Sequence, residues 1–407
     1  MSADVDVVIV GAGPAGLACA ADLAGLKVLL LEREERHGGR VRTIDLARQR
    51  VDMGACFAFD PSIAPARLTV PTGSLVQERA DMAVWGAGKA HQGATPLGCL
   101  LRMGIDETTR HRIESVARQS SQAASMRGTL AHSLLDALLH QVHPGNLDDY
   151  DARHHRDGLF TWYPDHWEHG NGTLTDSLLA GSGAELQLGA MVTAIAKRGD
   201  RVDVDYRIGE GTGKVSCRSA VVATTAPVAA SIVDWPDPRM RRFLAATRYA
   251  SYLVVALGGA ATRALPRFRS LVPLDGSPAL VVQQRSLARD RAVLLCYYRG
   301  ADCEMLASRS DAELTELSLQ RLAALGIAKT ALDALTESAV QRWEHAGTIL
   351  SSEYRGCRSD LAERGTESIF IAGDYACQDP GAGYGLADAM RSGIHAAQRV
   401  RAMLART

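Results

Sequence analysis

The chain has 407 residues, about two to three times the length of a usual single domain, so we expect two domains. Hydrophobic residues make up 46% of the chain and charged residues 22%, as in an ordinary globular protein. The 45 basic and 46 acidic residues nearly cancel, which argues against binding to nucleic acid or to an anionic membrane surface.

Membrane insertion, secretion and structural metal are also disfavoured. The longest nearly pure apolar run, residues 252–261, has about half the length that a membrane-spanning helix needs. The first six residues lack the basic flank and apolar stretch of a signal peptide. The eight cysteines are scattered without paired spacings, so we expect neither a disulfide framework nor a metal site. These features predict a cytoplasmic protein without an integral membrane segment.

Residues 5–31 have the pattern of a complete βαβ unit. Residues 5–10 form an almost continuous β-branched run, as in a strand buried on both faces. Strong helix formers follow at 17–24, and 27–31 is a second apolar strand. Between the first strand and the helix lies a turn whose residues we expect to shape a dinucleotide site: Gly11, Gly13, Pro14, Ala15 and Gly16.

The chemistry of such a site needs each glycine. Gly11 lets the chain turn sharply, Gly13 lets main-chain amides approach a pyrophosphate, and Gly16 lets the helix pack closely on the strand. The positive end of the helix then faces the phosphates. Glu32, at the tip of the second strand, can accept hydrogen bonds from both ribose hydroxyls, whereas a 2′-phosphate would clash with it. We therefore expect a dinucleotide other than NADP.

The segment 31–43 narrows the choice of dinucleotide. Gly38 and Gly39 permit a close backbone approach, and Arg40 beside them can neutralise two phosphates. The segment resembles the stretch after the first βαβ unit in the flavin-containing amine oxidase superfamily, which includes monoamine and polyamine oxidases, protoporphyrinogen oxidase and phytoene desaturase. The resemblance implies FAD, with Glu32 on the adenosine ribose and the Gly-Gly-Arg turn along the pyrophosphate. It makes Arg33, Gly39 and Arg40 cofactor-binding candidates.

The next segment with a weaker resemblance is 51–55. It is similar to the loop that passes the flavin ring, which would place Gly54 and Ala55 at the cofactor, although Asp52 can equally be a turn residue.

The stretch that follows is predicted to belong to a substrate domain. Residues 105–140 have helical spacing, with a leucine stripe expected in the core: Leu130, Leu134, Leu135, Leu138 and Leu139. Tyr163, Trp167 and His169 are candidates for a pocket wall, but packing is the better explanation for any single one of them.

Residues 183–195 alternate like a pair of strands and resemble the segment in which a valine main chain holds adenine, here Val192. Residues 201–206 and 214–223 read as a hairpin. Further strands are expected at 251–257, 279–283 and 292–298, and a helix at 311–325.

The lysines depart from the pattern of the amine oxidases proper. In those enzymes a substrate-domain lysine holds a water against the reactive nitrogen of the flavin and assists the reaction with oxygen. We expect it at 270–300, where this chain has no lysine and where Gln283-Gln284-Arg285 is the nearest polar cluster. This departure puts the typical mechanism in doubt and favours branches that abstract a hydride without this lysine.

The C-terminal part contains the second strong match. Residues 368–374 form a short apolar strand ending in Ala-Gly-Asp, and a helix is expected to open at 383. The resemblance implies that the aspartate binds a ribityl hydroxyl and that the helix start stabilises the reduced flavin through its dipole. Cofactor-binding candidates here are Gly373, Asp374, Gly383, Tyr384 and Leu386. Tyr384 is also the catalytic candidate, because amine oxidases place there an aromatic ring that guides a neutral amine to the flavin.

Together these patterns predict an α/β protein with a Rossmann-like FAD-binding domain of the glutathione-reductase type and an interleaved α+β substrate domain. We assign 1–60, 181–235 and 346–407 to the FAD-binding domain, and 61–180 and 236–345 to the substrate domain.

The predicted function is that of an FAD-dependent oxidoreductase that abstracts a hydride from a C–N or C–C bond of a small organic substrate. The alternatives are a desaturase or protoporphyrinogen-oxidase-like enzyme, a flavin isomerase without net redox turnover, and a flavin-free escort protein. The joint presence of Glu32, Arg40 and Asp374 speaks against the last of these. Formation of a homodimer is left open.

Overall fold

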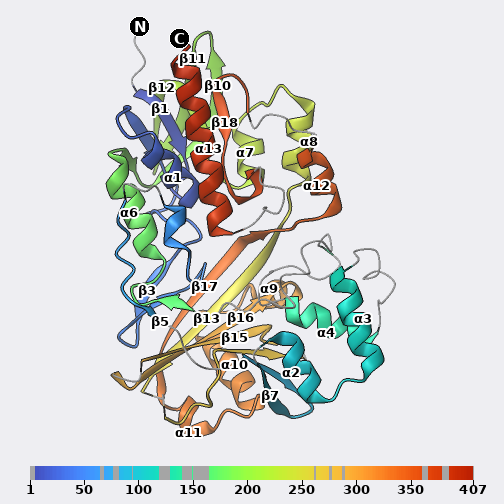
Figure 1. Cartoon of the computed structure of the whole chain (residues 1–407). Helices are drawn as coiled ribbons and strands as arrows, with labels where there is room; N and C mark the ends of the chain where they lie inside the picture. The colour runs from blue at the N-terminus through green and yellow to red at the C-terminus, as the bar shows by residue number, and fades with distance from the viewer. Residues whose placement is uncertain are drawn as a thin grey trace.

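The structure is a computed structural model in which two seven-stranded sheets lie one above the other (Figure 1). It describes residues 5–64, 68–76, 82–93, 95–118, 129–139, 149, 165–260, 263–274, 277–286, 289–359, 365–377 and 385–406. Within these ranges, none of the helices combines the length and the apolar character that crossing a bilayer requires. The predicted α/β architecture with a Rossmann-like unit is confirmed.

The first sheet contains the predicted βαβ unit. Its parallel part places β1 between β12 and β2, and β10, β11 and β12 form an antiparallel meander. The strands lie in the order β10-β11-β12-β1-β2-β9, with β18 beside β12: β10 (Ala190–Arg198), β11 (Arg201–Ile208), β12 (Gly211–Val222), β1 (Val5–Val10), β2 (Val28–Leu31), β9 (Glu185–Gln187) and β18 (Ile369–Ile371). The strands predicted at 5–10, 27–31 and 368–371 are confirmed, and so is the hairpin of β11 and β12. The two strands expected within 183–195 also form, but β9 pairs with β2 and β10 with β11.

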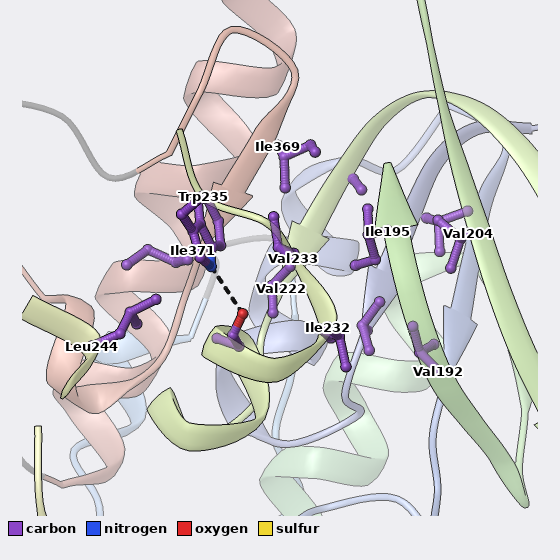
Figure 2. Packing of buried hydrophobic residues seen from close by; sticks show 14 of the residues in the cluster. Val192, Ile195, Val204, Val222, Ile232, Val233, Trp235, Leu244, Ile369 and Ile371 are labelled. Carbon is purple, nitrogen blue, oxygen red and sulfur yellow. Dashed lines mark hydrogen bonds between the residues drawn. The ribbon is translucent and has the colours of Figure 1, made fainter. Parts of the chain in front are cut away.

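Helices cover both faces of this sheet because its strands alternate buried residues on two sides. Val7 and Ile9 of β1 face the core under α1 (Pro14–Asp22), α6 (Gly172–Ser182) and α13 (Leu386–Leu404). Val8 and Val10 face the core on the opposite side, with the meander, α7 (Ala226–Ile232), α8 (Pro238–Ala246) and α12 (Ser352–Ser359). Figure 2 shows this second core, in which Trp235 donates a hydrogen bond of 2.8 Å to the main-chain oxygen of Ala229.

The second sheet is mostly antiparallel, in the order β17-β13-β16-β15-β14-β6-β7. Its strands are β17 (Leu335–Thr348), β13 (Tyr249–Gly259), β16 (Arg291–Arg299), β15 (Leu280–Ser286), β14 (Ser270–Pro273), β6 (Met82–Gly86) and β7 (Lys89–Gly93). The strands predicted at 251–257, 279–283 and 292–298 are confirmed as β13, β15 and β16, which are neighbours in this sheet. Figure 1 shows the long strands β13 and β17 reaching from this sheet toward the first one.

Each face of the second sheet has its own core. One face packs against α2 (Pro96–Met103), α3 (Glu107–Arg118), α4 (Leu130–Leu139) and the hairpin of β3 (Thr43–Leu46) and β4 (Gln49–Asp52). The other packs against α9 (Ala301–Leu306), α10 (Asp311–Ala324) and α11 (Lys329–Leu332). The helix predicted at 311–325 is confirmed as α10, which begins with a capping box of Ser310 and Glu313. Smaller elements are β5 (Leu75–Val76) paired with β8 (His166–Trp167), and the 3-10 helices η1 (Pro61–Ile63) and η7 (Asp374–Ala376).

The leucine stripe predicted within 105–140 is only partly in the core. Leu134 and Leu135 of α4 are buried, as expected. The prediction is wrong for Leu130, which is 57% exposed, because the buried face of α4 is formed by Ala131, Leu134 and Leu135. The side chains of Leu138 and Leu139 lie outside the described residues.

Two elements pack across the domain boundaries drawn from the sequence. Leu174 and Leu178 of α6 belong to the core of the first sheet, although 61–180 is assigned to the substrate domain. Phe243 and Leu244 of α8 also lie in a core of the first sheet. This packing favours moving both helices to the FAD-binding side. The domain boundaries themselves stay a prediction.

Candidate active site

A long groove begins where the first βαβ unit turns and ends against β17 of the second sheet. Its volume is about 500 Å³, within the range of cofactor and ligand sites. The predicted site residues that line it are Gly11, Gly13, Pro14, Ala15, Glu32, Arg33, Gly39, Arg40, Val192, Gly373 and Asp374. The structure therefore brings together residues from both ends and from the middle of the chain.

The glycine turn is shaped for a close approach of main-chain groups. Gly11 has a φ of +99°, and a Cβ there would lie 2.7 Å from the oxygen of Ala223. Gly39 has a φ of +53°, and a Cβ on it would lie 3.1 Å from the Cα of Gly13. The two loops thus meet at glycines, next to the N-terminus of α1, which is open to the groove at Gly13. Because a helix N-terminus attracts anions, this corner fits the pyrophosphate of a dinucleotide.

Gly16 lies behind this turn and away from the groove wall. A Cβ on Gly16 would lie 1.9 Å from the oxygen of Gly11 and 3.3 Å from the Cβ of Ala223. Its position is that of a residue that lets α1 pack closely on the strands.

Glu32 is buried, and its two carboxylate oxygens accept hydrogen bonds from the main-chain nitrogens of Ala12 (2.7 Å) and Glu34 (2.9 Å). A carboxylate has about four acceptor positions, so two remain for ribose hydroxyls. Arg33 points to solvent and pairs with Glu34 at 2.9 Å. The geometry of Glu32 fits the adenosine end of FAD.

Arg40 and Asp374 form the main ion pair of the groove. The two guanidinium nitrogens of Arg40 donate to the two oxygens of Asp374 at 3.1 and 2.8 Å, and Arg40 also donates to the main-chain oxygen of Ala346. Thr348 donates to Asp374 at 3.3 Å. From their motifs, these two residues are expected to bind different parts of the cofactor. In the structure, each compensates the charge of the other. Asp374 keeps about one acceptor position for a hydroxyl.

Gly54 and Ala55 lie beside Arg40 and behind the groove wall. The nitrogen of Ala55 donates to the oxygen of Arg40 at 3.2 Å. A Cβ on Gly54 would lie 2.0 Å from that oxygen and 3.2 Å from the ring of Trp343. The indole nitrogen of Trp343 donates to the oxygen of Met53 at 2.7 Å. This loop is therefore fixed to β17 and to the Gly-Gly-Arg turn.

Asn171, which is not among the predicted site residues, lies at the start of α6 and also holds this loop. Its side-chain nitrogen donates to the oxygens of Ala55 (2.7 Å) and Phe57 (2.8 Å), and its main-chain nitrogen donates to both oxygens of Asp52 (3.0 and 3.1 Å). The hydroxyl of Thr43 donates to Asp52 at 2.5 Å. The amide of Asn171 is fully buried, and its side-chain oxygen has no described partner. The Gly-Asn-Gly sequence at 170–172 is a signal that could have indicated it.

Burial shifts the pKa values of two groups near this loop. Desolvation raises the pKa of Asp52 from 3.8 to about 6, against the opposing effect of the hydrogen bonds from Thr43 and Asn171. Desolvation and then the positive charge of Arg269 lower the pKa of His166 from 6.5 to about 3. His166 is therefore a neutral, buried imidazole at physiological pH.

Several predicted residues lie elsewhere. Leu386 opens α13 and packs against the core under α1, rather than on the groove wall. Gly383 and Tyr384 lie outside the described residues, as does Tyr163. Trp167 packs on Phe59 and donates to its oxygen at 3.0 Å, which is a packing role. The roles of all these residues stay predictions.

The lysines are remote from the groove. All five lie in described ranges, and none lines the groove. Lys197, Lys214 and Lys329 pair with surface carboxylates at 2.5, 3.0 and 3.0 Å. The described groove thus offers no ammonium group to a cofactor.

The geometry defines a class of protein: a dinucleotide-binding fold in which the cofactor groove ends against a second, largely antiparallel sheet. A glycine-rich turn, a ribose-binding carboxylate and an arginine-rich wall fit a cofactor with an adenosine end and an anionic linker.

Comparisons with known proteins give the same result. Residues 106–401 match the family model for flavin-containing amine oxidoreductases, and residues 9–67 match an NAD(P)-binding Rossmann-like domain. The chain belongs to the family of flavin-containing amine oxidoreductases. The predicted superfamily is confirmed, and with it FAD as the cofactor of a flavin-dependent oxidoreductase.

The individual relatives match this chain over part of its length or at low sequence identity. The chain is 34% identical over 142 residues to "Putative flavin-containing monoamine oxidase AofH" of Mycobacterium tuberculosis, a match that covers 33% of this chain and 31% of AofH. The chain thus spans about a third of the length of the curated relatives it matches. Cyclohexylamine oxidase from Brevibacterium oxydans has a similar fold, with a TM-score of 0.75, 15% identity, and coverage of 99% of this chain and 100% of that one. Putrescine oxidase in its putrescine-bound form has a TM-score of 0.72 at 14% identity, covering 98% and 99%.

Proposed function

We propose that the protein oxidises the C–N bond of a small amine, with FAD as the hydride acceptor. The observation that carries this proposal is the groove itself, which joins the dinucleotide turn to the face of the second sheet in a chain of the amine oxidoreductase family. The relatives named as monoamine, cyclohexylamine and putrescine oxidases support an amine as the substrate. A C–C bond of a small organic molecule is the alternative.

In this proposal the first sheet holds the cofactor. Glu32 binds the adenosine ribose, the main chain of Val192 contacts adenine, and the turn at Gly11 and Gly13 receives the pyrophosphate at the N-terminus of α1. Asp374 accepts from a ribityl hydroxyl through its remaining acceptor position. When bound, FAD supplies the electron acceptor, which no side chain of the chain provides.

The second sheet would form the dry side of the pocket. Tyr252 and Tyr297 meet edge to face at 5.6 Å on the face that packs toward the hairpin of β3 and β4. A substrate that extends from the groove to this apolar face would be shielded from water, which favours the neutral form of a bound amine, the form that can lose a hydride. Tyr384, outside the described residues, is the predicted ring that guides the amine.

The absence of a lysine on the groove wall favours a dehydrogenase or a slow oxidase over an efficient oxidase. Oxygen would then reoxidise the reduced enzyme slowly, and an artificial acceptor would do so faster.

Anaerobic stopped-flow reduction tests the proposal. The purified protein should be yellow, release FAD rather than FMN on denaturation, and be reduced by a primary amine in the absence of oxygen. Tyr384→Phe should be mild, whereas Tyr384→Ala should slow the reduction while FAD stays bound. A protein that binds FAD but is reduced by no amine would refute amine oxidation and favour a desaturase or an isomerase. A colourless protein that FAD cannot reconstitute would favour the escort function.

A further inference from the structure

Two arginines of the groove wall, Arg36 and Arg42, have no carboxylate partner in the part of the chain that the structure describes. The other groove arginines do: Arg33 pairs with Glu34, Arg40 with Asp374, and Arg342 with Asp311 at 2.7 Å. The groove therefore has more positive charge than its own acidic groups compensate.

Arg36 uses its donors within the chain. Its guanidinium donates to the main-chain oxygens of His37 (3.0 Å), Gly39 (2.7 Å) and Val41 (3.3 Å). It braces the Gly-Gly-Arg turn, and burial followed by the charge of Arg42 lowers its pKa. The side chain of Arg42 makes one described hydrogen bond, and it lies next to a like charge.

Arg42 is oriented from the second sheet. It donates to the side-chain oxygen of Gln341, whose own nitrogen donates to the main-chain oxygen of Arg342 at 2.8 Å. This second hydrogen bond fixes the amide so that its oxygen faces Arg42. A guanidinium has five N–H donors, so most of them remain available to a ligand.

Through its hydrogen bond to Gln341, Arg42 lies at the end of the groove that β17 forms. Gln341 lies on β17 opposite Val254 of β13, which in turn lies opposite Tyr297 of β16. The head of Arg42 therefore reaches the row of the sheet that contains Tyr297. On its other side lies Arg36, which donates to the main-chain oxygen of Gly39 at the pyrophosphate corner.

We propose that Arg42 recognises a carboxylate of the substrate, so that the preferred amines are amino acids or other amines with an acidic group. The inference rests on the proposed function, because it names the substrate class of the same site. A planar guanidinium held on one side by Gln341 matches a carboxylate through two parallel hydrogen bonds.

Binding of a carboxylate can be measured without turnover. Benzoate and the uncharged benzamide are titrated into the FAD-loaded protein, and the change in the flavin absorption spectrum gives the two dissociation constants. We expect benzoate to bind about ten- to a hundredfold more tightly than benzamide, the ratio that a charge-assisted hydrogen bond provides. Arg42→Gln should abolish this preference without changing benzamide binding or FAD content, and Arg42→Lys should keep part of it. Arg50→Gln, whose arginine pairs with Asp45 outside the groove, is the matched control and should behave like the parent.

The outcomes of these titrations decide between explanations. Equal binding of benzoate and benzamide by the parent, or a preference that survives in Arg42→Gln, overturns the proposal. A lower FAD content of Arg42→Gln, with an unchanged benzoate preference in the fraction that retains FAD, assigns the residue to the pyrophosphate instead, which also overturns it. A benzoate preference that depends on Arg42, in a protein that no amine reduces, supports the anion site and refutes the proposed function. Reduction by amines without a benzoate preference supports the proposed function and overturns the carboxylate site at Arg42.

Discussion

Replacing Asp52 by asparagine should change how the stability of the protein depends on pH. Burial raises the pKa of Asp52 from 3.8 to about 6, so the folded state takes up this proton at a higher pH than the unfolded chain. The protonated carboxyl therefore stabilises the fold at low pH, and that stabilisation is lost as the pH rises through about 6. A difference of about 2 pKa units corresponds to about 3 kcal/mol in total. About 2 kcal/mol of this falls between pH 4.5 and 7.5.

Urea titrations of the FAD-loaded protein at several pH values measure this effect. The free energy of unfolding of Asp52→Asn, relative to that of the parent, should increase by about 2 kcal/mol from pH 4.5 to pH 7.5, because the variant has no proton to lose. Asp45→Asn, an exposed carboxyl on the same hairpin, should follow the parent at every pH. A difference that stays constant with pH, or that decreases, would refute the reasoning. It would mean that the hydrogen bonds from Thr43 and Asn171 outweigh burial and keep the carboxyl charged.

Three further predictions concern groups elsewhere in the fold. Burial lowers the pKa of His166 to about 3, so the fold loses stability as the pH falls below about 6.5. His166→Gln should therefore shift the acid-unfolding midpoint to lower pH, and an unchanged midpoint would contradict this. Glu32→Gln and Asp374→Asn should each lower FAD affinity about ten- to a hundredfold in a fluorescence titration, whereas full affinity in both would mean that the dinucleotide is misplaced. A Cβ on Gly393 would lie 2.1 Å from a main-chain oxygen of α1, so Gly393→Val should destabilise the protein by about 1–3 kcal/mol. Gly356→Ala, where a Cβ meets nothing within 4 Å, is the control for thermal unfolding.

The local parts of the fold are predictable from the sequence because their signals are local. The βαβ unit at 5–31 combines a β-branched run, a glycine turn and a helix-forming stretch, and each has its own periodicity. The same holds for α10 and for the strands β13, β15 and β16 of the second sheet. Leu130 shows the limit, because helical spacing places it with the other leucines but does not reveal that the buried face of α4 is centred on Ala131, Leu134 and Leu135.

Contacts between segments that are distant in the sequence could not be predicted. Arg40 and Asp374 are each recognisable from their motifs, but their bidentate pairing across 334 positions depends on how β18 is placed beside β12. Asn171 has no periodic pattern or motif of its own, and its role follows from four hydrogen bonds made in the folded state. Spacing along the chain contains no information on such pairs.

The loop at 53–57 couples the two halves of the molecule. From the second sheet, Trp343 donates to the oxygen of Met53, and from α6 on the first sheet, Asn171 donates to the oxygens of Ala55 and Phe57. If one sheet moved relative to the other, the main chain of this loop could not move with it without straining its hydrogen bonds to the other sheet. The loop predicted to pass the flavin is thus positioned by the relative placement of both sheets. A substrate that packs against the second sheet is therefore oriented toward a cofactor bound on the first, because the same loop fixes the distance between the two.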